Sequence, residues 1–154
     1  MKVLFVCYGN IMRSAFAEAC FQDELSRNAK LKGIGFASAG VRAQVDERAE
    51  PHARKMARKF GLSLESHRAR RTSSELLKQF DRVYIMDQLN EELLVGDCPE
   101  VTNKTAYLSS LIAGERKEIE DPYCQSEEQL EACFQTIQRA VRNLADELSN
   151  QSTA

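Results

Sequence analysis

Two cysteine–arginine pairs with the same spacing are the residues best suited to chemistry in this sequence. Cys7 and Arg13 lie six positions apart in VCYGNIMRS, and Cys133 and Arg139 are separated identically in CFQTIQR. A cysteine thiolate is a strong nucleophile, and an arginine guanidinium can bind two oxygens of one phosphate group. A pair that converged on a phosphate could therefore transfer a phosphoryl group through sulfur.

The second pair lies within a stretch of helical periodicity. Its expected core stripe consists of Leu130, Cys133, Ile137, Val141, Leu144 and Leu148. Six residues rotate an α-helix by about 240°, so we expect Arg139 to point away from the side that carries Cys133. The two side chains should not meet on one ligand. We interpret Cys133 as core packing, because a free cysteine packs as a small hydrophobic residue.

The first pair lies at the junction of a strand and a helix. Residues 2–7 form an apolar run without alternation, which is typical of a strand buried on both faces. Helical spacing starts at Ser14, so residues 8–13 must form a loop. Gly9 and Asn10 adopt left-handed backbone at low cost, which lets the loop turn successive N–H groups toward an oxyanion.

This loop predicts a phosphate site with Cys7 at its floor. The backbone amides, the positive end of the helix at Ser14 and the Arg13 guanidinium all favour a thiolate over a thiol. Cys7 is therefore predicted to be a nucleophile beneath a bound phosphate. The predicted phosphate-binding residues are Tyr8, Gly9, Asn10, Ile11, Met12, Arg13 and Ser14.

Cleavage of a phosphate ester also needs an acid, because the departing oxygen must be protonated. Asp121 in the segment DPY is a candidate, since Pro122 restricts the backbone beside it. The same residues also fit a turn that leads into a capping box at Ser126 and Gln129. The residues alone leave both interpretations open.

The elements that must position these residues alternate along the chain. Strands are expected at 2–7, 35–39, 82–86 and 104–108, and helices at 14–26, 51–60, after the third strand through 94, and at 126–148. Such alternation predicts one α/β domain over 1–150, in which helices cover both faces of a parallel sheet, followed by a frayed tail at 151–154. Ligands of such folds bind at the carboxyl ends of the strands.

Composition excludes several other classes of protein. The 154 residues carry a net charge of −2, which gives no general attraction to nucleic acid or to anionic membranes, and we expect the basic stretches HARKMARKF and HRARR to be solvated surface. Five cysteines without CxxC spacing argue against a disulfide framework and a zinc site. The apolar run in MKVLFV is shorter than the ~7–15 residues of a signal sequence, and we expect a cytoplasmic protein.

The motifs together resemble a known family. VCYGNIMRS, SAG at 38–40, HRAR at 67–70, FDRVYIMD at 80–87 and DPY at 121–123 are similar, in order, to the low-molecular-weight protein tyrosine phosphatases. The resemblance implies a single three-layer domain with a four-stranded parallel sheet of order 2-1-3-4 and the phosphate loop after strand 1. It implies hydrolysis of phosphotyrosine through a cysteinyl-phosphate, with Asp121 as general acid and no cofactor or metal.

The resemblance also assigns supporting roles. Asn10 would hold the loop in its turn, Ser14 would donate a hydrogen bond to Cys7, and Ser38 and His67 would support Asn10. The expected walls of the substrate cleft are Tyr8, Gln44, Tyr123 and Cys124. Phosphotyrosine proteins or peptides are the implied partners, a tyrosine kinase is left open as a further one, and the chain would be a monomer or associate weakly.

Two departures and two rival functions qualify this expectation. Met12 replaces a second cysteine found in many members, so we expect poorer protection of Cys7 against oxidation. Ile11 stands where protein-arginine phosphatases carry threonine, which favours the tyrosine branch.

An arsenate reductase would need two further cysteines after the third strand, where the sequence has only Cys98. A catalytically silent phosphate-binding module would need neither Cys7 nor Asp121.

Overall fold

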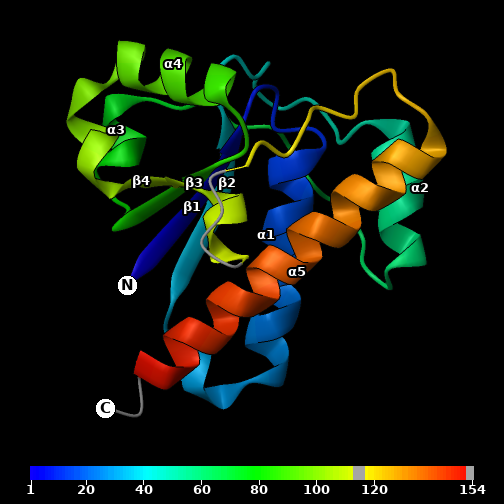
Figure 1. Ribbon diagram of the computed structural model, residues 1–154, viewed down its shortest axis with the longest axis horizontal. Helices are drawn as coiled ribbons and strands as arrows, with labels where there is room; N and C mark the ends of the chain where they lie inside the picture. Colours follow the sequence, from blue (N-terminus) through cyan, green and yellow to red (C-terminus); the bar gives the residue numbers. More distant parts are fainter. Residues whose placement is uncertain (113–116, 152–154) are drawn as a thin grey trace.

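The protein is built on a four-stranded parallel sheet of order β2-β1-β3-β4, as expected (Figure 1). The computed structural model describes residues 1–112 and 117–151. The strands are β1 (Lys2–Cys7), β2 (Gly35–Gly40), β3 (Arg82–Ile85) and β4 (Thr105–Tyr107). All their pairings are parallel, and β1 is paired on both edges, which explains its continuous apolar run.

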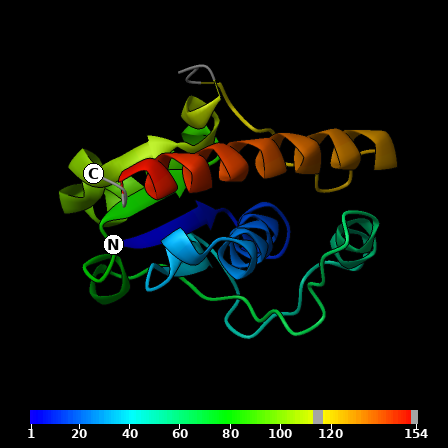
Figure 2. The ribbon, with the colours of Figure 1, turned by 90° about the horizontal axis from the view of Figure 1, so that it is seen from below.

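Helices cover both faces of the sheet. The helices α1 (Arg13–Arg27) and α5 (Glu127–Gln151) lie side by side on one face, and α5 runs the length of the molecule there (Figure 2). The other face carries α3 (Ser74–Leu77) and α4 (Gln88–Asp97), while α2 (Pro51–Lys59) packs beside α5. Short 3-10 helices span Ala29–Leu31, Pro99–Lys104 and Leu108–Leu111.

The alternating side chains of β1 divide the core in two. Phe5 and Cys7 belong to the apolar cluster under α1 and α5. Leu4 and Val6 belong to the cluster under α3 and α4. Successive side chains of a strand point to opposite faces, so this one strand contributes to both layers. The side chain of Cys7 thus lies on the face of the sheet that α1 and α5 cover.

The expected core stripe of α5 is buried except at one residue, Cys133. Phe134 is fully buried and stacks on Phe16 of α1 with ring centroids 3.9 Å apart, whereas Cys133 is only partly buried at the edge of the cluster. The larger ring fills the space between the helices, and Cys133 packs against the cluster from its edge instead of lying at its centre. The capping box is confirmed, with Ser126 N donating to Gln129 Oε1 at 3.0 Å and Gln129 N to Ser126 Oγ at 3.1 Å.

The strand order creates a switch point beside Cys7. The chain leaves β1 through α1 toward β2 on one side, and β3 lies on the other side of β1. Crevices at such points are where ligands bind in open α/β sheets. The expected tail is shorter than proposed, because Gln151 still belongs to α5, and 152–154 lie outside the described residues. Within the described chain, no helix is both long and apolar enough to cross a membrane.

Candidate active site

Cys7 ends β1 with its sulfur enclosed by polar groups of the following loop. The residue is 3% exposed. Its Sγ lies 2.9 Å from Ser14 Oγ and accepts a hydrogen bond from the Asn10 backbone N–H at 3.3 Å. The Ser14 hydroxyl oxygen accepts a hydrogen bond from Asn10 Nδ2 at 2.8 Å, and its proton can go to the sulfur or to the Ala39 carbonyl oxygen, which lies 3.3 Å away. This arrangement can stabilise a thiolate.

Asn10 holds the loop in its turn. Its backbone φ of 56° is left-handed, a conformation that asparagine tolerates better than most residues. The side chain is fully buried, and Nδ2 also donates to Ser38 Oγ at 2.9 Å while Oδ1 accepts from Arg70 N at 2.9 Å. The carbonyl oxygen accepts from His67 Nε2 at 2.6 Å. The expected contacts of Ser38 and His67 with Asn10 are therefore present.

Gly40 lets the end of β2 approach the loop from behind. A Cβ at this position would lie 2.6 Å from the Tyr8 carbonyl oxygen and 2.8 Å from Asn10 N. These are backbone atoms, which cannot move aside as a flexible side chain could. The loop thus packs directly against the end of β2. Just after β2, Val41 N donates to the Cys7 carbonyl oxygen at 3.0 Å.

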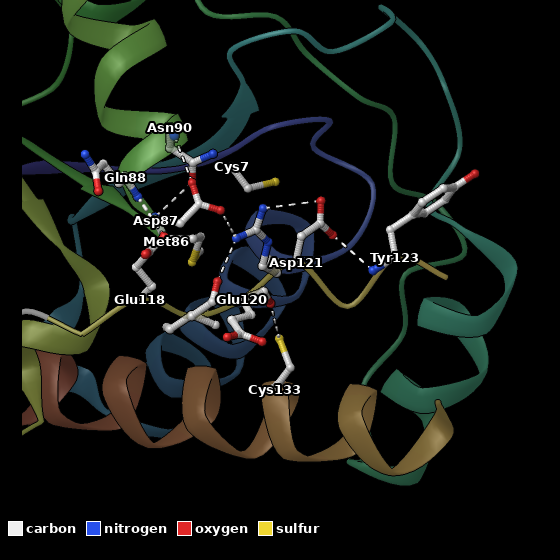
Figure 3. A network of polar contacts seen from close by, with 12 residues as sticks. Cys7, Met86, Asp87, Gln88, Asn90, Glu118, Glu120, Asp121, Tyr123 and Cys133 are labelled. Carbon is white, nitrogen blue, oxygen red and sulfur yellow. Dashed lines mark hydrogen bonds and ion pairs between the residues drawn. The ribbon is translucent and has the colours of Figure 1, made fainter. Parts of the chain in front are cut away.

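Arg13 begins α1 and is anchored by two groups from distant segments. The side chain is 2% exposed, and its NH1 donates to Asp87 Oδ2 and to the Ile119 carbonyl oxygen, both at 2.7 Å (Figure 3). Burial by itself would lower the pKa of Arg13, but the charges of Cys7 and Asp121 and the contact with Asp87 together raise it. The guanidinium is therefore a permanent, fixed cation beside the sulfur.

Asp121 reaches the same place from the segment before α5. Its Oδ2 lies 3.6 Å from Arg13 NH2, and its side chain is 49% exposed. Oδ1 accepts a hydrogen bond from Tyr123 N at 3.1 Å, which fixes the carboxylate within an Asp-Pro turn. The two interpretations of DPY are therefore compatible, because the turn itself presents the acid beside Arg13 (Figure 3).

These residues surround one cavity of about 350 Å³. It is lined by Cys7, Tyr8, Gly9, Ile11, Met12, Arg13, Arg42, Gln44, Glu47, Asp121 and Tyr123. The aromatic side chains of Tyr8 and Tyr123 are 43% and 57% exposed and form walls, as expected. Asn10 and Ser14 are buried and do not line this cavity. Cys124 does not line it either, but lies on an adjoining groove. In 1–112 and 117–151, no cluster of His, Cys, Asp or Glu side chains is suited to a metal ion.

The second cysteine–arginine pair is placed differently from the expectation. Cys133 and Arg139 both line a groove of about 420 Å³ between α5 and the segment that carries Asp121, so they share one hollow. Burial raises the pKa of the Cys133 thiol to about 12. Its Sγ lies 3.9 Å from the Glu120 carbonyl oxygen, which it can reach only as a neutral donor. Cys133 is therefore a thiol and not a second nucleophile.

Three contacts of this site were missed by reasoning from the sequence. Asp87 was quoted only as the end of FDRVYIMD, and Ile119 was not singled out at all. A signal for Asp87 did exist, since a carboxylate directly after a buried strand lies at the ligand-binding end of the sheet. The carbonyl oxygen of Ile119 carries no side-chain signal. Glu18, which accepts from Ser38 Oγ at 2.7 Å, was missed as well.

Comparison with known proteins agrees with this geometry. The chain matches the family model described as low molecular weight phosphotyrosine protein phosphatase over residues 2–154. Low molecular weight protein-tyrosine-phosphatase Wzb of Escherichia coli strain K12 is 34% identical over 148 residues, which are 96% of this chain and 95% of that protein. Etp of the same strain is 32% identical over 148 residues, with 96% and 95% covered.

Solved structures show the same likeness. The tyrosine phosphatase Wzb from Escherichia coli K30, in complex with sulphate, gives a TM-score of 0.84 at 32% identity, covering 96% of this chain and 97% of that one. The YwlE arginine phosphatase from Geobacillus stearothermophilus gives 0.87 at 27% identity, covering 97% and 94%. The chain belongs to the low molecular weight phosphotyrosine protein phosphatase family, and is thereby a phosphoric monoester hydrolase.

Proposed function

We propose that this protein hydrolyses phosphotyrosine in proteins or peptides, together with small aryl phosphates, through a cysteinyl-phosphate. The observation that carries the proposal is a single cavity with Cys7 at its floor and with Arg13 and Asp121 on its walls. A nucleophile, an oxyanion-binding cation and a proton donor are the groups that transfer of a phosphoryl group to sulfur requires. The aromatic walls fit a phenyl ring.

In the first step the sulfur of Cys7 attacks phosphorus. The loop amides and the Nε and NH2 edge of Arg13 bind the equatorial oxygens, because NH1 is already occupied by Asp87 and Ile119. A bond forms between sulfur and phosphorus while the bond from phosphorus to the phenolic oxygen breaks. Asp121 gives its proton to that oxygen, so the product leaves as neutral tyrosine.

In the second step water hydrolyses the cysteinyl-phosphate. Asp121, now ionised, removes a proton from the attacking water, whose oxygen bonds to phosphorus as the bond to sulfur breaks. Cys7 leaves as a thiolate, which the Ser14 hydroxyl 2.9 Å away can stabilise. Inorganic phosphate departs, and both catalytic groups return to their starting states.

Protein-arginine phosphatase activity is a second candidate, since the fold is as similar to that of the YwlE arginine phosphatase as to that of Wzb. Ile11 lines the cavity and presents only carbon to a substrate. An apolar side chain packs well on a phenyl ring and offers no partner to a guanidinium. Phosphotyrosine is therefore the preferred substrate.

An arsenate reductase is disfavoured by the position of Cys98. This thiol is buried in the cluster under α3 and α4, on the face of the sheet opposite to the side chain of Cys7. It lies 3.0 Å from Ser74 Oγ. A relay of disulfides from Cys7 would have to cross the sheet.

The test is hydrolysis of para-nitrophenyl phosphate by wild type and three variants without added metal. Cys7→Ser should abolish turnover, and Asp121→Asn should reduce it sharply. Cys133→Ser is the matched control and should retain it, because Cys133 lies outside the catalytic cavity. A folded wild type without turnover would contradict the proposal and favour a silent phosphate-binding module.

Peptides then separate the two substrate classes. We expect turnover of phosphotyrosine peptides with kcat/KM well above that of phosphoserine or phosphoarginine peptides. Preference for phosphoarginine would instead support the second candidate.

A further inference from the structure

A second groove adjoins the catalytic cavity on the far side of Tyr123. It has a volume of about 570 Å³ and shares Met12 and Tyr123 with the catalytic cavity. It runs between α2 and the segment that enters α5, two elements that lie side by side (Figure 1). Figure 3 shows the ring of Tyr123 turned away from Asp121 and Asp87, and Tyr123 lines both hollows.

The charges along this groove are unequally compensated. Glu50 is occupied by the start of α2, where it accepts from His52 N at 3.0 Å and lies 2.7 Å from His52 Nδ1. Glu127 is held by Lys59 at 2.6 Å, and its pKa is lowered first by that hydrogen bond. Lys55 is exposed and forms no ion pair within 4.0 Å with any residue of 1–112 or 117–151, although its charge also helps to lower the pKa of Glu127.

The floor of the groove is apolar. Met12, Met56 and Leu130 line it and are 5%, 1% and 5% exposed. An extended peptide advances about 3.3–3.6 Å for each residue, so one that anchors its phosphotyrosine in the cavity places neighbouring residues at the groove. The methylene groups of an acidic side chain can pack on such a floor while its carboxylate meets Lys55.

We infer that this groove binds an acidic residue close to the phosphotyrosine in the substrate peptide, and that Lys55 recognises its carboxylate. The inference rests on the proposed phosphotyrosine phosphatase function and adds the class of sequence around the target. Small aryl phosphates do not extend past Tyr123, so they should not sense this groove.

The experiment uses three substrates and two charge reversals. The substrates are para-nitrophenyl phosphate, a phosphotyrosine peptide flanked by alanines, and matched peptides with glutamates on the amino or the carboxyl side. Lys55→Glu is the test variant. Lys32→Glu is the control, because it changes net charge equally and lies before β2 at the opposite end of the sheet.

Lys55→Glu should lower kcat/KM for one of the glutamate peptides by about threefold to tenfold, the scale of an exposed charge contact that is reversed. The alanine peptide and para-nitrophenyl phosphate should be unaffected, and added salt should shrink the difference. Equal loss on all substrates, or none on either glutamate peptide, would overturn the inference. Normal turnover of the small substrate in that case would leave the proposed catalytic function standing.

Discussion

The contact between Asp87 and Arg13 offers a sharp test of how the cation is held. The two side chains are 11% and 2% exposed and lie 2.7 Å apart. Asp87 also caps α4 by accepting from Asn90 N at 2.8 Å. Asparagine caps a helix about as well as aspartate, so Asp87→Asn can keep the cap through its single oxygen. It removes the charge, and its Nδ2 replaces the oxygen that accepts from Arg13.

The expected size of the effect follows from these contacts. A hydrogen bond to a charged group contributes about 1.5–3 kcal/mol, and complete loss of one partner of a buried pair costs about 3–5 kcal/mol. Arg13 keeps its contacts with the carbonyl of Ile119 and with Asp121, so we expect the cost of Asp87→Asn to lie in the range of about 1.5–3 kcal/mol. If the whole loss falls on transition-state binding, kcat/KM drops roughly 10- to 150-fold.

The assay combines kinetics with unfolding. Values of kcat/KM for para-nitrophenyl phosphate and midpoints of urea unfolding are measured for wild type, Asp87→Asn and Asp87→Ala. Asp146→Asn is the matched control, because Asp146 is exposed on α5 and should change neither quantity. Asp87→Ala should lose about 1 kcal/mol more stability than Asp87→Asn, since it also removes the cap.

Two results would refute this reasoning. If Asp87→Asn kept kcat/KM within twofold of wild type, the contact would not orient Arg13 for catalysis. A loss of stability without a loss of activity would show that Asp87 serves the fold alone.

Three further predictions concern other parts of the site. Gly40→Ala should reduce kcat/KM at least tenfold by displacing the phosphate loop, whereas Gly96→Ala, whose added Cβ meets nothing within 4 Å, should leave kinetics unchanged. Asn10→Ala should unfold at lower urea than Asn10→Gly, because a left-handed φ of 56° costs alanine about 1–2 kcal/mol and glycine almost nothing. Peptide mapping after iodoacetamide should find Cys133 unmodified at pH 7, with labelling that rises as pH approaches its pKa of about 12, while exposed Cys124 reacts readily. Modification of Cys133 at pH 7 would contradict its assignment as a neutral thiol.

Local patterns were enough to predict the loop around Cys7. The buried strand, the Gly9-Asn10 pair and the helix start all lie within a few residues of Cys7, so neighbouring side chains determine that geometry. The strand order and the role of Asp121 came from the resemblance to a family. The short helix α3 was not predicted, because its four residues carry too little helical periodicity to be recognised.

The anchors of Arg13 could not be predicted in the same way. Asp87 and Ile119 are 74 and 106 positions away in the sequence, and only the folded sheet brings them together. On α5, only the choice between Cys133 and Phe134 was not predicted. Cys133 and Phe134 both fit a helical stripe, and the choice between them depends on the ring of Phe16 on a different helix.

Because Arg13 is anchored on the carbonyl of Ile119, its side chain supports two of the proposed catalytic tasks, which are the binding of phosphate and the positioning of Asp121. Ile119 lies two positions before the acid at Asp121, and Ile119 N is itself bonded to the Met86 carbonyl at 2.8 Å. A shorter side chain in place of Arg13 therefore loosens the segment that is proposed to deliver the proton as well as the proposed contact with phosphate. Activity lost in Arg13→Lys measures both tasks together. In a double-mutant cycle with Asp121→Asn, the loss of transition-state stabilisation in the double variant should be smaller than the sum of the losses in the two single variants.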